Sequence, residues 1–314
     1  MRASVAVASR SFSKHPVLRA ELEARFPDAR FNDAGASLRG AELVAFLQGC
    51  EKAVLALETV DDALLSRLPE LKLISKFGVG LDSVDLEALK RRGVKLAWTP
   101  GTNSRSVAEL ALMTTLALLR RLPETQADLR AGTWRQLKGG TLSGRCVGLV
   151  GLGAVARELV DLLAPFKCRV LAHDPAPDRA FADSRGVRLV ALDELLRESD
   201  VVSLHVPLLP ATRGLMNAQA LALMRSSAVL VNTARGGLID EGALLAALDA
   251  GRLAGAALDA FAVEPCADAR LLAHPKLLAT PHVGGSTEEA ILAMGRAAIA
   301  GLDAGRDAAE FLRR

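Results

Sequence analysis

Short apolar runs alternate with helix-length amphipathic segments along almost the whole chain. In the first third, four apolar runs predict buried strands, at Val5–Ala8, Ala53–Leu57, Leu73–Ser75 and Val94–Ala97. Between these runs, apolar residues recur at helical spacing in Val17–Phe26, Ala41–Leu47 and Leu86–Arg91. Such alternation predicts an α/β fold in which helices cover both faces of a parallel sheet.

A second series of the same kind begins near residue 146. Its predicted strands are Cys146–Val150, Arg169–Ala172, Val201–Leu204, Ala228–Val231, Ala256–Leu258 and Leu277–Ala279. Predicted helices lie between them, most clearly Ala154–Leu163 and Glu241–Leu248. Two such series predict two doubly wound parallel-sheet domains.

Two further amphipathic or apolar helices are predicted outside these series. One is Ser106–Leu119, with Ser104 or Ser106 placed to cap its start and Pro123 to end it. The other is Glu288–Leu302, which we expect to return and pack on the first domain.

Composition narrows the class of protein. The length of 314 residues suggests about two domains, and 39 basic against 36 acidic residues give a net charge of +3. These charges are scattered, which argues against a nucleic-acid partner. The longest stretch without charged residues, Val201–Thr212, is too short to span a bilayer. We expect no signal peptide before the first apolar run. The four cysteines are widely spaced and form no CxxC pair, which indicates reduced thiols in the cytoplasm. The same spacing predicts no metal site.

The segment GLGAVA, Gly151–Ala156, follows a predicted strand and opens a predicted helix. Gly151 permits a tight turn, and Gly153 lets a pyrophosphate approach the backbone at the positive end of the helix. The next strand leads to Asp174, at the distance where an acidic residue accepts hydrogen bonds from a dinucleotide's ribose hydroxyls. Because no arginine directly follows Asp174, NAD is favoured over NADP, although Arg179 lies nearby.

Three later predicted strands lead into polar residues of different kinds, namely Arg235, Glu264 and His282. Because the carboxyl ends of parallel strands meet at one edge of a sheet, we expect these side chains to lie close together. A guanidinium grips a carboxylate, and an imidazole gives or takes a proton. A carboxylate beside that imidazole orients it and favours its charged form. Facing a nicotinamide, these groups predict reduction of a 2-keto acid.

Seven motifs in order carry a family resemblance. They are GVGLDSVDLEAL (Gly78–Leu89), TPGTNSRSVAELAL (Thr99–Leu112), LVGLGAVARELV, SLHVPLLPATRGLM (Ser203–Met216), VNTARGGLIDEGALLAAL, GAALDAFAVEP and TPHVGGST. From about residue 70 onward the chain resembles the D-isomer-specific 2-hydroxyacid dehydrogenases. Its motifs are most similar to the D-3-phosphoglycerate dehydrogenase branch, without that branch's frequent C-terminal regulatory extension.

The resemblance implies reversible hydride transfer between NAD(H) and a D-2-hydroxy acid. It implies a flavodoxin-like substrate domain of residues 1–98 and 286–314, and a Rossmann NAD-binding domain of residues 99–285. The active site is expected in a cleft that closes between the two domains. A homodimer is expected through the helix Ser106–Leu119 and the arm around Trp134.

The resemblance also implies a role for each site residue. Arg235 binds the substrate, His282 is the acid/base, and Glu264 is the partner of that histidine. The residues expected to bind substrate are Lys76, Val79, Gly80, Asn103, Arg235 and His282. The residues expected to bind the cofactor are Gly151, Gly153, Ala154, Val155, Asp174, Val206, Pro207, Thr233, Ala234, Arg235, Asp259, His282, Gly284 and Gly285.

Several alternatives stay open at this point. Lys76, Arg10 and Arg105 could supply positive charge for the phosphate of 3-phosphoglycerate, or could be solvated rim residues. In the second case the substrate is glyoxylate, hydroxypyruvate or a lactate-like acid. A formate- or phosphite-type dehydrogenase and an NAD(H)-sensing corepressor share the fold.

Other residues attract attention without a catalytic role. Trp98 stands where the family often has Asn and could alter the pocket. Cys266, near Glu264, is an inert buried thiol or a redox-sensitive one. We interpret His205 as structural, and His15 and His274 as surface residues.

Overall fold

The structure, a computed structural model, describes residues 4–312. Within that range the chain forms two compact units. Unit 1 runs to Asn103 and resumes at Glu288, and unit 2 is Ser104–Thr287. The boundaries expected from the sequence, after residues 98 and 285, lie a few residues before these.

Unit 1 is built on a parallel sheet with the strand order β2-β1-β3-β4-β5. Its strands are β1 (Val5–Val7), β2 (Arg30–Phe31), β3 (Lys52–Leu55), β4 (Leu73–Lys76) and β5 (Lys95–Ala97). Its helices are α1 (Arg10–Lys14), α2 (Pro16–Arg25), α3 (Gly40–Leu47), α4 (Asp62–Leu65), α5 (Leu86–Arg92), α14 (Glu288–Gly301) and the short 3₁₀ helix η3 (Ala308–Glu310). Two apolar clusters, one on each face of the sheet, form its core.

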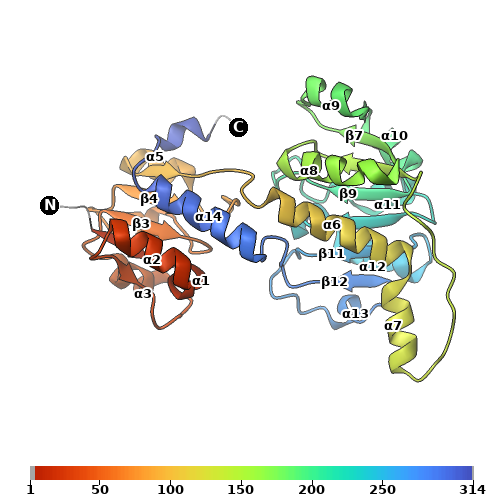
Figure 1. Cartoon of the computed structure of the whole chain (residues 1–314), viewed down its shortest axis with the longest axis horizontal. Helices are drawn as coiled ribbons and strands as arrows, with labels where there is room; N and C mark the ends of the chain where they lie inside the picture. The colour runs from red at the N-terminus through yellow and green to blue at the C-terminus, as the bar shows by residue number, and fades with distance from the viewer. Residues whose placement is uncertain (1–3, 313–314) are drawn as a thin grey trace. The chain divides into compact units, whose positions relative to one another are not determined.

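The helix α14 packs on unit 1, as the sequence predicted (Figure 1). It lies beside α2 and across β4, where the Ser75 hydroxyl donates to the carbonyl oxygen of Ala298 at 2.6 Å. Gly295 allows the close approach, because a Cβ there would lie 2.2 Å from Leu18. This contact joins the C-terminal segment to the first sheet.

Unit 2 is built on a seven-stranded sheet with the order β12-β11-β10-β9-β6-β7-β8, and every strand pair is parallel. Its strands are β6 (Cys146–Val150), β7 (Arg169–His173), β8 (Arg188–Leu189), β9 (Val201–Leu204), β10 (Val229–Asn232), β11 (Gly255–Leu258) and β12 (Leu277–Ala279). The strand order reverses between β6 and β9, and ligands of such sheets bind beyond the carboxyl ends of the strands at this point.

The helices of unit 2 cover both faces of this sheet (Figure 1). They are α6 (Ser104–Leu119), α7 (Leu122–Arg130), α8 (Ala154–Leu163), α9 (Arg179–Arg185), α10 (Leu192–Glu198), α11 (Ala218–Leu223), α12 (Glu241–Asp249), α13 (Ala269–Leu272) and the 3₁₀ helices η1 (Ala164–Phe166) and η2 (Gly236–Leu238). The helix α6 packs against α8 on one face, together with β10 and β11.

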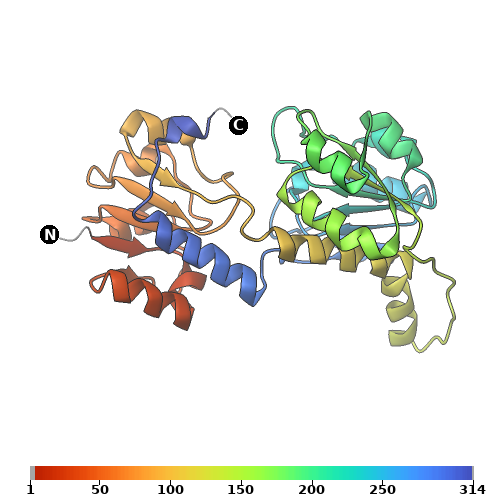
Figure 2. The same cartoon turned by 45° about the horizontal axis from the view of Figure 1, so that its top comes forward.

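The C-terminal end of α6 at Leu119 is confirmed, but the roles expected for Ser106 and Pro123 at the ends of the helix were wrong. The helix begins at Ser104, so Ser106 lies in its first turn, where its hydroxyl bonds to the carbonyl oxygen of Gly284 instead of capping the helix. The helix ends at Leu119, before Pro123. Pro123 belongs to the first turn of α7, where a missing N–H is tolerated, after Arg121 has turned the chain with a φ of 54°. In Figure 2, α7 leaves the end of α6 and the following segment loops out before β6.

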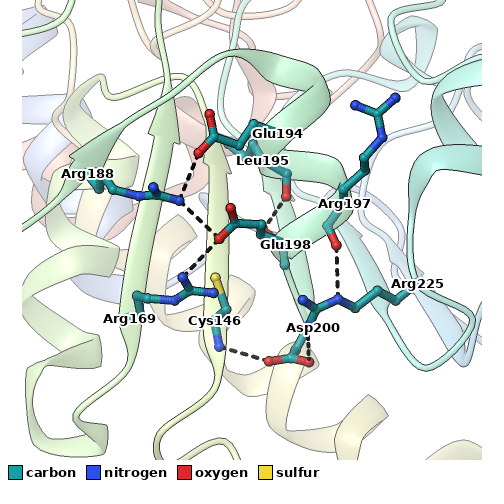
Figure 3. A network of polar contacts seen from close by, with 10 residues as sticks. Cys146, Arg169, Arg188, Glu194, Leu195, Arg197, Glu198, Asp200 and Arg225 are labelled. Carbon is teal, nitrogen blue, oxygen red and sulfur yellow. Dashed lines mark hydrogen bonds and ion pairs between the residues drawn. The ribbon is translucent and has the colours of Figure 1, made fainter.

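Ion pairs link the amino ends of the unit 2 strands (Figure 3). Glu198 accepts from Arg169 at 2.9 Å and from Arg188 at 3.0 Å, and Asp200 accepts from the backbone N–H of Cys146 at 2.9 Å. Arg225 pairs with Asp200 at 3.3 Å. Because this edge lies opposite the carboxyl ends of the strands, these charges brace the sheet away from the predicted site.

Candidate active site

The turn after β6 has the shape that a dinucleotide pyrophosphate requires. Gly151 has a φ of +95°, a conformation that side chains disfavour. A Cβ there would also lie 2.7 Å from the carbonyl oxygen of His205, so both the backbone conformation and the packing require glycine. Gly153 precedes α8, and a Cβ there would meet nothing within 4 Å. Open space therefore faces the N-terminus of α8, where Ala154 and Val155 contribute backbone N–H groups.

Asp174 is fixed beside this turn. One of its carboxylate oxygens accepts from the N–H of Leu152 and the other from the N–H of Ala176, both at 2.8 Å. Each oxygen keeps a second lone pair for a ribose hydroxyl. Arg157, on α8, pairs with Asp178 at 3.0 Å.

The strand register places four residues in a row at the carboxyl edge of the sheet, namely Gly151, His205, Thr233 and Asp259. Each directly follows the last residue of its strand, β6, β9, β10 or β11. These last residues are paired with one another across the sheet. Within the described residues, His205 Nε2 and Thr233 Oγ1 are buried without a hydrogen-bond partner. Burial lowers the pKa of His205 to about 4, so its ring is neutral. Buried polar atoms left unpaired at this edge fit a polar ligand such as the nicotinamide end of NAD.

Arg235 follows β10 in a turn that Asn232 holds. The fully buried Asn232 side chain donates to the carbonyl oxygen of Arg235 at 2.8 Å and accepts from the N–H of Ala234 at 3.0 Å. Sequence reasoning missed Asn232, although a polar residue ending an apolar strand is a usable signal. The next residue, Gly236, packs against the backbone of Phe261, since a Cβ there would lie 1.8 Å from the Phe261 carbonyl carbon. The Arg235 turn therefore adjoins the loop that bears Glu264.

His282 and Glu264 form the pair that the sequence predicted from strand ends. The Nδ1 atom of His282 lies 3.0 Å and 2.9 Å from the two oxygens of Glu264. Since an ionised carboxylate only accepts, Nδ1 donates and Nε2 faces away as the second ring nitrogen. Glu264 is itself fixed by the N–H of Phe261 at 3.0 Å. Both side chains are partly exposed, at 47% and 40%.

Asp259 holds the loop that carries His282. This buried carboxylate accepts from the Thr280 hydroxyl at 2.7 Å and from the N–H groups of Val283 at 2.7 Å and Gly284 at 2.8 Å. The sequence predicted Asp259 at the nicotinamide end of a cofactor site. The structure adds a structural role that the sequence did not suggest.

Unit 1 carries the other predicted substrate residues. Lys76 is buried, and its Nζ donates to the carbonyl oxygen of Ala56. The partly exposed turn at Val79 and Gly80 follows β4, and Trp98 Nε1 donates to the carbonyl oxygen of Val79 at 3.0 Å. Trp98 thus braces this turn. Asn103 is the last residue before the chain enters unit 2.

The remaining histidines and cysteines have structural surroundings. The expectation that His15 and His274 are surface residues was wrong, because their side chains are only 11% and 10% exposed. Each accepts a backbone N–H through Nδ1, from Leu18 and Lys276 respectively. Burial raises the pKa of the thiols of Cys50, Cys146 and Cys168.

None of the helices in residues 4–312 combines the length and apolarity that a bilayer crossing requires. In the same part of the chain, no group of three or more His, Cys, Asp or Glu side chains is arranged to hold a metal ion.

Comparison with known proteins identifies the family. Residues 112–284 match the model of the D-isomer specific 2-hydroxyacid dehydrogenase NAD-binding domain, so unit 2 is an NAD-binding domain. The D-3-phosphoglycerate dehydrogenase of Sus scrofa is 39% identical over 257 residues, covering 81% of this chain and 48% of the relative. The chain thus spans about half the length of the curated relatives it matches.

Solved structures agree with that assignment. A Polaromonas sp. JS6 66 protein assigned to the D-isomer specific 2-hydroxyacid dehydrogenases superposes with a TM-score of 0.88 at 31% identity, covering 97% of this chain and 96% of the other. A glyoxylate reductase from Paecilomyes thermophila superposes with a TM-score of 0.83 at 26% identity, covering 95% and 93%. The sequence motifs, the two parallel sheets and these matches lead to one conclusion: the chain belongs to the D-isomer specific 2-hydroxyacid dehydrogenase family.

Proposed function

We propose that the protein is an NAD-dependent dehydrogenase that interconverts a D-2-hydroxy acid and the corresponding 2-keto acid. The observation that carries this proposal is the His282–Glu264 pair, with Nδ1 bonded to both carboxylate oxygens and the Arg235 turn packed against the adjacent loop. Turnover needs an anion-binding group, a proton donor and a cofactor site, and unit 2 supplies all three at one edge of its sheet.

Each side chain has a distinct task in the proposed reaction. When bound, NADH supplies the hydride that reaches the carbonyl carbon. Arg235 grips the carboxylate next to that carbonyl, because a guanidinium forms two parallel hydrogen bonds to it. Nε2 of His282 gives its proton to the carbonyl oxygen, and Glu264 stabilises the protonated ring through Nδ1. In the oxidative direction the neutral ring takes the proton back.

In unit 1, Val79 and Gly80 are proposed to bind the substrate carboxylate through backbone N–H groups, with Asn103 near the same pocket. Support comes from the exposed position of this turn after β4 and its fixation by Trp98.

The side chain of the substrate is the open part of this proposal. The similarity to D-3-phosphoglycerate dehydrogenases supports a phosphorylated acid. However, Lys76 is engaged by a backbone carbonyl, and Arg105 pairs with Glu109 at 2.8 Å and with Glu158 at 3.5 Å. Of the three cations considered for a phosphate, only Arg10 has no bond to another group in the described residues. This favours, as a second candidate, a small 2-keto acid without phosphate.

NADH oxidation with a panel of 2-keto acids tests both candidates. The panel contains 3-phosphohydroxypyruvate, hydroxypyruvate, glyoxylate and pyruvate. A higher kcat/KM for the phosphorylated acid supports the first candidate, and a higher value for an unphosphorylated acid supports the second. Binding of NADH without turnover of any of the four would support a cofactor-sensing protein and contradict the proposed enzyme.

We also propose a homodimer that forms through α6, α7 and the arm after them. A groove of about 870 Å³ lies there, and its lining includes Met113, Leu122, Leu129 and Trp134. These four side chains are 50%, 46%, 52% and 84% exposed. An exposed apolar patch of this kind marks an interaction surface, and a second copy is the occupant that the family resemblance implies.

A cytoplasmic location is proposed as well. Its support is that the four cysteines are free thiols, the state that a reducing compartment maintains.

A further inference from the structure

The loop that carries His282 is held through both backbone polar groups of one residue, Gly284. On one side, Asp259 accepts from the N–H of Gly284 at 2.8 Å. Ser106, in the first turn of α6, donates its hydroxyl to the carbonyl oxygen of the same Gly284 at 2.6 Å. The donor and acceptor are 178 residues apart in the chain. The loop is therefore fastened both to the sheet and to the helix that covers it.

Packing leaves Gly284 little freedom. A Cβ at Gly284 would lie 3.0 Å from the Asp259 carboxylate and 3.4 Å from the Val107 side chain. Ser106 is 9% exposed, so its hydrogen bond is shielded from water. Removal of the hydroxyl would leave the Gly284 carbonyl without this donor and free one side of the loop.

The position of His282 depends on this loop. Its φ of 54° lies in the left-handed region, which a residue with a side chain occupies only when its surroundings impose it. The ring is 47% exposed, and among residues 4–312 Glu264 is the group that bonds to it, through Nδ1. The backbone of the loop therefore fixes where Nε2 stands.

We propose that Ser106 is a positioning residue, which acts on the reaction through His282 by fixing the backbone at Gly284. This inference rests on the proposed function, in which His282 is the proton donor. Displacement of an acid by a fraction of an ångström to 1 Å is enough to slow proton transfer strongly.

The test compares Ser106→Ala with Ser104→Ala. Ser104 is a matched control, because it is a serine of the same helix turn with the same 9% exposure, and no hydrogen bond of its hydroxyl is found among the described residues. Ser106→Ala should lower reductive kcat by roughly 10–100-fold while NADH affinity, measured by fluorescence, stays within about twofold. Ser104→Ala should match the parent.

A double variant shows whether Ser106 acts through His282. Once His282→Ala has removed the proton donor, adding Ser106→Ala should reduce the residual turnover no further. If Ser106→Ala alone keeps the parental kcat, or lowers turnover equally in both backgrounds, the positioning role is refuted. If His282→Ala itself keeps parental turnover, the proposed function fails instead.

Discussion

At the scale of single residues, Gly236 brings the Arg235 turn into contact with the loop that bears Glu264. It follows Arg235 directly, and its backbone touches that of Phe261 and Ala262. Phe261 in turn donates the N–H that fixes Glu264. The contact therefore sets the distance between the Arg235 turn and the Glu264 carboxylate, which orients His282.

We predict that Gly236→Ala lowers kcat/KM at least tenfold. A Cβ at this position would lie 1.8 Å from a backbone atom, so the Arg235 turn and the Glu264 loop must separate. Overpacking of this kind costs about 1–3 kcal/mol of stability or more, which thermal unfolding would register. Gly242→Ala is the control, since its nearest contact is 3.4 Å and it should behave as the parent. Parental activity for Gly236→Ala would show that this packing does not set the site.

At the scale of elements, sequence patterns located most strands and several helices well. The bounds of β6, β9, β12 and α8 coincide with the predicted segments, because each is an apolar or amphipathic run with a sharp end. The edge strands β2 and β8 were not predicted, since two residues carry no periodicity. The helix α7 was missed because Pro123 was taken as the end of a helix when it belongs to the start of one.

The groove beside α6 and α7 leads to a prediction about assembly. A buried carboxylate in an apolar interface is costly, so Met113→Glu should shift the proposed dimer to monomers in light scattering after gel filtration. Leu272→Glu is the control, because Leu272 is also partly exposed, at 42%, but lies on α13 outside the groove. A parent that is already monomeric, or a Met113→Glu dimer of parental affinity, would contradict this assignment.

At the scale of the whole molecule, the sequence indicated the location of the proposed site but not the hydrogen bonds that hold its loops in place. Arg235, Glu264 and His282 could be expected together, because parallel strands end at a common edge. Ser106 and the loop contacts of Asp259 could not, since each bonds a segment whose position depends on the folded sheet. Hydrogen bonds between residues distant in sequence leave no local pattern to read.

The buried His205 makes stability depend on pH. Its folded-state pKa, lowered by burial to about 4, lies below the value of 6.5 in the unfolded chain. The unfolded state therefore binds more protons between these values, and stability that is present above pH 6.5 is lost as the pH falls towards 4.

We predict that the free energy of unfolding of the parent falls by roughly 2 kcal/mol more between pH 7 and pH 5 than that of His205→Gln. Urea unfolding at both pH values measures this difference. Equal losses for parent and variant would show that His205 does not carry the effect.

The central claim is that His282, supported by Glu264, is the proton donor in reduction of a 2-keto acid. The most direct measurement is reductive kcat for Glu264→Gln beside the parent, with NADH affinity measured on the same samples. The amide removes the carboxylate that bonds to Nδ1, so kcat should fall roughly tenfold or more while NADH affinity stays as in the parent. A parental kcat for Glu264→Gln would contradict the account.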